Sequence, residues 1–346
     1  MSMKAKILEL LREKKDRVAA GAPESEAYVS GQELCEQFGV SRTAVWKAIG
    51  QLKKEGYVIE AVQNRGYRLL DQTEEVYNQA DIQSRLKTKW VAHPLQFFDS
   101  IDSTNIRAKL EAEQGAESGL LVVSDMQSAG RGRRGRGWES PAGINIYYTL
   151  MLKPDFSSDC APMLTLVMAL AVAKGIRQTL RRDSEEAAAK VGIKWPNDIV
   201  VDGKKVCGIL TEMSAQMDYV NHIVIGIGIN VHNESFPEEI APVATSLYME
   251  TGEHFNRAAL IEEVWEQFEH YYAIFMETED LSGLVKEYDA HLVNRNQIVK
   301  VLDPKEPFEG KAMGITPRGE LIVDTWESRR LVSAGEVSVR GVYGYV

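Results

Sequence analysis

The 346-residue sequence is poor in the residues that build metal centres and disulfide frameworks. It has three cysteines, Cys35, Cys160 and Cys207, without a CxxC pair, and six scattered histidines that lack metal-ligand spacing. We therefore expect no zinc or other metal site built from these residues and no disulfide framework. Reduced thiols of this kind are typical of cytoplasmic proteins.

Long apolar runs are also missing from the sequence. No run approaches the ~20 residues that a membrane-spanning helix needs, and the N-terminus has no apolar core of a secretory signal. We therefore predict a soluble, cytoplasmic protein with no membrane contact. The Walker A pattern GxxxxGK[ST] is absent as well, so any nucleotide must be bound in another way.

Positive charge is in short supply, with 40 Lys and Arg against 50 Asp and Glu, a formal net charge of −10. This balance excludes a protein that binds nucleic acid over its whole surface, and any such binding must use a local basic patch. The length predicts two or three domains at about 100–200 residues each.

The first 70 residues have the pattern of two short helices followed by a hairpin. Ser30 and Glu33 have the spacing of a capping box before one helix, and Ser41 can cap the next. YVIEAV and YRLL have strand composition and are joined by the turn NRG. The pattern indicates a winged helix-turn-helix domain over residues 1–72. The polar stretch at 71–80 is predicted to be a linker.

The charge of this domain favours DNA as its ligand. Between residues 41 and 70, six Lys or Arg stand against two acidic residues, a local excess of four. A helical protein-docking module with a solvated basic face is the alternative. The predicted DNA contacts are Ser41, Arg42, Thr43, Trp46, Lys47 and Arg65.

Alternating helices and strands predict a mixed α/β domain over residues 80–292. We expect a strand of period two in INIYYTLML and a long apolar helix at about 162–181. Asp202-Gly203 predicts a tight hairpin between two strands. Two amphipathic helices, near 256–276 and 280–291, close the domain.

The segment GRGRRGRG at 130–137 gathers four arginines and four glycines. Glycines let backbone N–H groups approach a ligand closely, and arginines bind oxyanions through paired hydrogen bonds. The segment lies between two predicted strands and is followed by Trp138, which can anchor it. An active-site flap that binds phosphate or carboxylate therefore fits better than the alternative, a solvated RNA-binding segment.

Four motifs together resemble the biotin protein ligase family. They are DSTN at 102–105, GRGRRGRGW at 130–138, KWPND at 194–198 and GKKVCGIL at 203–210. They occur in the family's order, and the resemblance covers essentially the whole chain. The winged helix ahead of them is similar to that of the bifunctional members, which attach biotin and repress biotin operons. The resemblance implies an α+β multidomain protein whose catalytic domain is related to class II synthetase-like folds.

The resemblance also implies a two-step reaction. Biotin and MgATP condense to biotinoyl-5′-AMP with release of pyrophosphate, and biotin then passes to a lysine of the biotin carboxyl carrier protein of acetyl-CoA carboxylase. Fixed positive groups would stabilise the charge that gathers at the α-phosphate. A closed flap would keep water from the mixed anhydride. The same resemblance implies that biotinoyl-AMP favours a homodimer that binds operator DNA.

Roles for individual residues follow from the same resemblance. The implied catalytic residues are Lys205, Arg133 and Asp198, with Lys205 near the biotin carboxyl group and the phosphate. Asp198 would position magnesium or the incoming carrier lysine. The implied contacts to biotin and the adenylate are Ser103, Thr104, Asn105, Gln127, Arg131, Gly132, Arg133, Lys205, Gly208, Gly228 and Asn230.

Several of these residues also have a plain structural interpretation. Ser103 and Thr104 could be ordinary helix caps, and Asn230 could cap a turn. Lys205 could be a solvated hairpin lysine, which is the role we expect for Lys204.

From about residue 294 the sequence changes to short strands at even spacing, separated by Pro and Gly. This pattern predicts a small β-barrel over 293–346, which the resemblance makes SH3-like. Arg340 could contact the nucleotide or the flap, or could be an exposed strand residue. The tail GVYGYV has no predicted role.

Two other functions stay open at this point. One is a metabolite-sensing transcription regulator with an inactive ligase domain, and the other is a ligase for a related acyl acid such as lipoate. The intact flap, KWPND and Lys205 count against the first. The arginine-rich flap favours biotin over the second.

Overall fold

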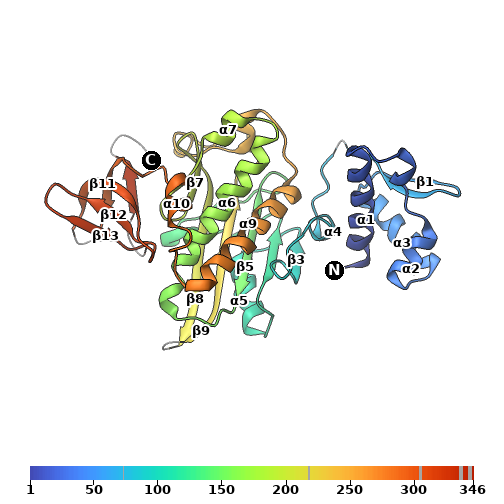
Figure 1. The fold of residues 1–346 in the computed structure, drawn as a ribbon, viewed down its shortest axis with the longest axis horizontal. Coiled ribbons are helices and arrows are strands. Elements are labelled where there is room, and N and C mark those ends of the chain that lie inside the picture. Colours follow the sequence, from blue (N-terminus) through green and yellow to red (C-terminus); the bar gives the residue numbers. More distant parts are fainter. Residues whose placement is uncertain (73, 217–218, 304–305, 335–337, 342–344) are drawn as a thin grey trace. The chain divides into compact units, whose positions relative to one another are not determined.

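The computed structural model describes residues 1–346 except 73, 217–218, 304–305, 335–337 and 342–344. The chain divides into two compact units, Met1–Lys87 and Thr88–Val346. Each unit is described separately below, and Figure 1 labels many of the elements.

The first unit is a winged helix-turn-helix, as predicted. Its elements are α1 (Met3–Ala19), the 3-10 turn η1 (Glu24–Ala27), α2 (Gly31–Phe38), α3 (Arg42–Lys54) and the antiparallel hairpin of β1 (Ile59–Val62) and β2 (Gly66–Leu69). The Ser30 Oγ accepts a hydrogen bond from Glu33 N at 3.0 Å, and the Ser41 Oγ accepts one from Ala44 N at 3.3 Å. Gly39 ends α2 with φ 64°, a conformation that favours glycine.

A short helix, α4 (Gln79–Gln83), belongs to this first unit. Its Asp81 is buried, and the carboxylate pairs with Arg12 of α1 and, at 3.4 Å, with Arg85. A buried carboxylate is stable only with such partners. The compact unit therefore extends to Lys87, beyond the segment 71–80 predicted as a linker.

The second unit contains a mixed sheet in the order β3-β4-β5-β9-β8-β7-β6. Its strands are β3 (Leu95–Phe98), β4 (Leu120–Ser124), β5 (Ile146–Leu152), β6 (Val191–Lys194), β7 (Asp198–Val201), β8 (Lys204–Gln216) and β9 (Tyr219–Ile229). The β3–β4 pair is parallel and the other neighbours are antiparallel. The predicted hairpin at Asp202-Gly203 joins β7 and β8.

Helices cover both faces of this sheet. On one face α6 (Met163–Arg181) and α9 (Arg257–Thr278) pack side by side, and Tyr148 of β5 contacts Trp265 of α9 with ring centroids 5.1 Å apart. On the other face Ala108 and Ala112 of α5 (Thr104–Glu113) pack on Met151 of β5. All seven residues of β5 are therefore buried, and the expected period-two pattern was wrong because neither face meets water.

The helix predicted at 162–181 is confirmed as α6. The stretch Ser158–Arg181 is long and apolar enough to cross a membrane, but 78% of its apolar window is buried inside the protein. A Cβ at Gly175 would lie 2.8 Å from the Val264 Cγ2 of α9, so this glycine permits the close approach of the two helices. The apolar composition of α6 thus serves the core.

The remaining helices of this unit are short. They are η2 (Arg133–Gly135), η3 (Ser158–Cys160), α7 (Glu185–Ala189), α8 (Leu247–Thr251) and α10 (Val285–His291). The helices predicted near 256–276 and 280–291 correspond to α9 and α10.

The C-terminal part forms an antiparallel sheet in the order β13-β12-β11-β10-β14. Its strands are β10 (Ile298–Leu302), β11 (Phe308–Ile315), β12 (Leu321–Asp324), β13 (Arg329–Val332) and β14 (Ser338–Gly341). Val299, Val301 and Val323 lie in its interior. The Trp195 Nε1 donates a 3.0 Å hydrogen bond to the carbonyl of Gly319, which joins the KWPND segment to this sheet.

Candidate active site

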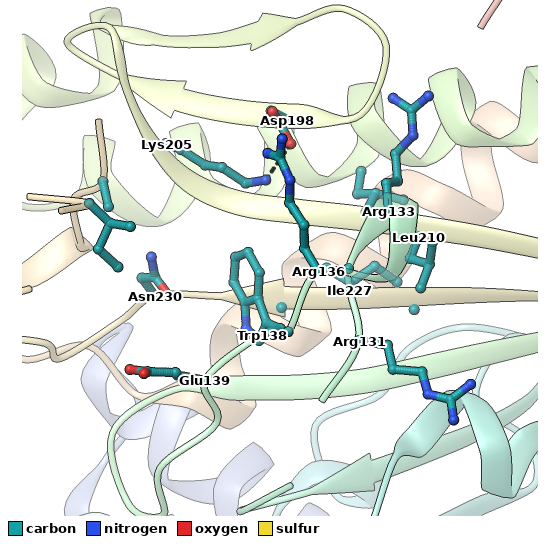
Figure 2. A pocket seen from close by; sticks show the side chains of 18 of the residues that line it. Arg131, Arg133, Arg136, Trp138, Glu139, Asp198, Lys205, Leu210, Ile227 and Asn230 are labelled. Carbon is teal, nitrogen blue, oxygen red and sulfur yellow. Dashed lines mark ion pairs between the residues drawn. The ribbon is translucent and has the colours of Figure 1, made fainter. Parts of the chain in front are cut away.

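A cavity of about 530 Å³ lies on the sheet face that carries α5 (Figure 2). Residues from the start of α5, the Gly/Arg flap, β6 to β9, the loop after β9 and the C-terminal end line it. Twelve residues predicted to bind substrates or to act in catalysis all line this one cavity: Ser103, Thr104, Asn105, Gln127, Arg131, Gly132, Arg133, Asp198, Lys205, Gly208, Gly228 and Asn230. The fold therefore brings together segments more than 100 positions apart.

One part of the lining is neutral and rich in hydrogen-bonding groups. Gln127 Oε1 accepts hydrogen bonds from the Thr104 N and Oγ1 at 2.9 and 3.1 Å. Thr149 Oγ1 donates to Asn105 Oδ1 at 2.6 Å. Ser103 occupies the N-cap position of α5, but its side chain makes no capping hydrogen bond, so the plain-cap interpretation does not describe it. Such groups suit a neutral polar ring.

Glycines on β8 and β9 leave room for these side chains. A Cβ at Gly226 would lie 2.0 Å from Asn105 Oδ1, and one at Gly228 would lie 2.6 Å from the indole of Trp138. Trp138, at the end of the flap, thus rests against the backbone of the sheet. Its buried Nε1 has no hydrogen-bond partner among the described residues, which leaves a donor for a ligand.

Cations surround a single carboxylate in the other part of the lining. Lys205 Nζ lies 2.6 Å from Asp198 Oδ1, the ion pair drawn as a dashed line in Figure 2. Lys194 Nζ lies 3.9 Å from Asp198 Oδ2. Burial alone would raise the pKa of Asp198, but Lys205 and Lys194 hold that pKa below its usual value. Asp198 is therefore ionised at neutral pH.

Lys194 is a pocket residue that the sequence analysis did not single out. Its side chain is 7% exposed, and burial lowers its pKa to about 8 against the opposing effect of Asp198. Its place in KWPND was the available signal. A lysine with this pKa changes charge just above neutral pH.

The flap arginines do not all point the same way. Arg133 donates to Asn197 Oδ1 at 2.8 Å and to the carbonyl of Ala334 at 3.2 Å, which ties the flap to the KWPND segment and to the C-terminal part. Burial lowers the pKa of Arg133. Arg131 is exposed, and its side chain points in a different direction (Figure 2). Gly132 N donates to the Arg136 carbonyl at 2.8 Å, closing the turn.

The two neighbouring hairpin lysines lie in different environments. Lys205 lines the cavity and its backbone pairs with the loop after β9, through Val243 and Thr245. Lys204 is exposed and lies outside the lining. Asn230 lines the cavity and also donates to the Thr245 carbonyl at 3.1 Å.

Two C-terminal residues reach the same cavity. Arg340 is exposed on β14 and belongs to the lining. Tyr345 also lines it, and its hydroxyl donates a 2.5 Å hydrogen bond to Asp198 Oδ2. No sequence signal marked Tyr345, because only tertiary packing places this residue against KWPND. The other residues of GVYGYV at 342–344 lie outside the described residues.

The described residues contain no group of three or more His, Cys, Asp or Glu that could hold a metal ion. The carboxylates among the described lining residues are Glu139 and Asp198. A magnesium ion can be held by one carboxylate when phosphate oxygens supply other ligands.

In the first unit, the predicted DNA contacts lie on α3 and the wing. Ser41 caps α3, and Arg42 donates to Gln32 Oε1 at 3.0 Å. The exposed surface of α3 and the wing includes Arg42, Thr43, Trp46, Lys47 and Arg65. Trp46 is 68% exposed on this surface. Arg65 lies over the Tyr28 ring, 4.2 Å from its centroid.

Three family models match the chain in succession. Residues 24–68 match the HTH domain, residues 97–230 the biotin/lipoate A/B protein ligase family, and residues 296–340 the biotin protein ligase C terminal domain.

Relatives and solved structures extend the similarity to almost the whole chain. The chain is 38% identical to the bifunctional ligase/repressor BirA of Bacillus spizizenii, over 94% of this chain and 98% of that protein. It is 30% identical to the protein of the same name from Escherichia coli, over 90% and 92%. The biotin protein ligase from Aquifex aeolicus in complex with biotin and ATP superposes with a TM-score of 0.62 and 29% identity, over 71% of this chain and 98% of that one. The chain belongs to the family of bifunctional biotin ligase/repressor proteins.

Proposed function

We propose that the chain joins biotin to a carrier protein at the expense of ATP and represses transcription when its adenylate is bound. The observation that carries the ligase function is the composition of one cavity. It combines the neutral hydrogen-bonding groups around Asn105 and Gln127 with the cations Lys194, Lys205 and Arg133. Biotin, a neutral ring with an anionic end, and ATP, a polyanion, match this pair of environments.

In the first step an oxygen of the biotin carboxylate attacks the α-phosphorus of ATP, and pyrophosphate leaves. Lys205 and Arg133 supply fixed positive charge where the negative charge of the transition state gathers. Lys194 adds a third cation from β6. Magnesium, when bound through the phosphate oxygens, would neutralise the leaving pyrophosphate.

In the second step a lysine amine of the biotin carboxyl carrier protein attacks the carbonyl carbon of biotinoyl-AMP, and AMP leaves. Arg133 keeps the flap over the anhydride through its hydrogen bonds to Asn197 and Ala334. A closed flap limits hydrolysis. The remaining lining residues named above are proposed contacts to biotin and the adenylate.

Three functional parts follow from this proposal. Residues 1–72 bind DNA, residues 80–292 carry out the ligase reaction, and residues 293–346 help to bind ATP and the carrier. The protein acts in the cytoplasm, in keeping with the free thiols of Cys35, Cys160 and Cys207.

In the DNA complex, α3 lies in the major groove and the wing lies at the edge of that groove. One such unit offers few contacts, so operator binding requires two copies that read two half-sites. We propose that biotinoyl-AMP favours this homodimer, and linkage then requires the dimer to bind biotinoyl-AMP more tightly than the monomer does.

One incubation tests the ligase function against its alternatives. The protein is mixed with biotin or lipoate, labelled ATP and a carrier domain, and both pyrophosphate release and carrier labelling are followed. Biotin-dependent release and labelling are expected. Lipoate-dependent labelling would establish a related acyl ligase, and absence of pyrophosphate release with either acid would establish a regulator without ligase activity.

The repressor function is tested by operator binding at fixed salt with no ligand, with biotin and with a non-hydrolysable adenylate analogue. Operator binding should be tightest with the analogue, and sedimentation should show a dimer in the presence of the analogue. Removal of residues 1–87 should abolish operator binding and retain ligase activity. We choose this end point because removal of residues 1–70 would take Arg12 away from the buried Asp81. Operator affinity that ignores the analogue would refute the coupling and leave the ligase function intact.

A further inference from the structure

The penultimate residue of the chain, Tyr345, lies in the ligase cavity and contacts two of its charged groups. Its hydroxyl donates a 2.5 Å hydrogen bond to Asp198 Oδ2, and its ring lies 3.6 Å, at the centroid, from Lys194 Nζ. Val346 extends the contact, because a Cβ at Gly203 of the β7–β8 turn would lie 3.1 Å from its Cγ2. Two residues of the tail are thus fixed against the hairpin that carries Asp198 and Lys205.

Tyr345 completes the set of donors around the Asp198 carboxylate. Lys205 occupies Oδ1 at 2.6 Å, and the tyrosine hydroxyl occupies Oδ2. Lys194 lies further away, at 3.9 Å from Oδ2. The neutral hydroxyl is the weaker of the two close donors, since hydrogen bonds from charged donors are roughly twice as strong. An entering group would therefore displace Tyr345 more readily than Lys205.

The second step of the reaction brings such a group to this place. An acceptor lysine has a pKa of about 10.4 in water and attacks only as the neutral amine. The like charges of Lys194 and Lys205 favour that neutral form, and its proton leaves to solvent. A carboxylate oxygen can then hold the amine by accepting one of its N–H groups. Asp198 is one of two carboxylates among the described lining residues, and the other, Glu139, is exposed.

We propose that Tyr345 is a specificity-determining residue that holds the amine-binding oxygen of Asp198 until an acceptor lysine displaces it. The proposal rests on the ligase function given above. A docked carrier protein supplies binding energy for the displacement from its whole interface. A free amine or an unrelated surface lysine supplies only its own hydrogen bond, so Tyr345 disfavours it.

Once the hydroxyl is displaced, the step proceeds as an ordinary aminolysis. The amine nitrogen forms a bond to the anhydride carbonyl carbon, and the carbon–oxygen bond to AMP breaks. AMP leaves with that electron pair. The nitrogen loses one of its two N–H protons to solvent and keeps the other in the amide. The products are the amide and AMP.

The test compares a protein acceptor with a small one. Biotinoyl-AMP is formed on the enzyme, and single-turnover rates are measured with the apo carrier domain and with Nα-acetyl-lysine amide. Tyr345→Phe removes the hydroxyl and retains the ring over Lys194. We expect it to lower the ratio of the carrier rate constant to the small-amine rate constant roughly tenfold, because the reaction with the small amine becomes faster. Roughly tenfold is the scale of one hydrogen bond to a charged group. Tyr219→Phe, at a 64% exposed tyrosine of β9, is the matched control and should leave the ratio unchanged.

Each single-turnover rate constant is independent of the fraction of enzyme that is active, so a destabilised variant still shows which of the two reactions has changed. Removal of Tyr345 and Val346 should shift the ratio in the same direction. An unchanged ratio in both variants would overturn the proposal, as would a selective loss of the carrier reaction, which would mark Tyr345 as a carrier contact. The proposed function fails separately, if the native protein releases no pyrophosphate with biotin and ATP.

Discussion

Replacement of Lys205 by alanine is the sharpest test of the cation cluster. The change removes an ammonium group that lies 2.6 Å from Asp198 Oδ1 in the cavity where two anionic substrates must meet. Loss of one fixed electrostatic stabiliser typically lowers a rate about 10²–10³-fold. The Lys205 side chain is 25% exposed, and Lys194 remains 3.9 Å from the same carboxylate, so we expect a loss near 10²-fold in adenylation.

The assay is pyrophosphate release in a single turnover with saturating biotin and ATP. Lys204→Ala is the matched control, because Lys204 is the adjacent residue of β8 and its side chain is exposed. Lys205→Arg keeps the charge and should recover part of the rate. Stability should change by only about 1 kcal/mol, since Asp198 keeps Tyr345 and Lys194 as partners and Lys205 is partly solvated. Equal rates for Lys204→Ala and Lys205→Ala would refute the assignment of Lys205 to the reaction.

Four further outcomes are expected. Gly226→Ala places a Cβ 2.0 Å from Asn105 Oδ1 and should raise the KM for biotin at least tenfold, as measured by pyrophosphate release, whereas Gly50→Ala, which meets no atom within 4 Å, should not. Burial lowers the pKa of Lys194 to about 8, so the free enzyme loses this cation as the pH rises through 8. The value of kcat/KM for biotin should therefore fall above about pH 8, and Lys194→Arg should move this fall to higher pH. Arg133→Gly breaks the flap contacts to Asn197 and Ala334 and should speed adenylate release in a chase experiment; an unchanged release rate would contradict the flap model. Lys47→Ala should weaken operator binding and lower the salt slope by about one ion, measured by titration at several salt concentrations.

Local sequence patterns determined the parts of this protein. Ser30, Ser41 and Gly39 fixed the ends of two helices through short-range capping, and Asp202-Gly203 fixed a hairpin, because these features depend on neighbouring residues alone. The Gly/Arg flap was visible in the same way, since four arginines among glycines cannot form a core.

Long-range packing decided the rest. The alternation expected for β5 was wrong because α9 and α5 cover opposite faces of the sheet, and neither contact is written in the strand itself. The low pKa of Lys194 arises from burial, which depends on the whole fold around it. Tyr345 reaches Asp198 across 147 positions of sequence, so only the tertiary structure could place this residue in the cavity.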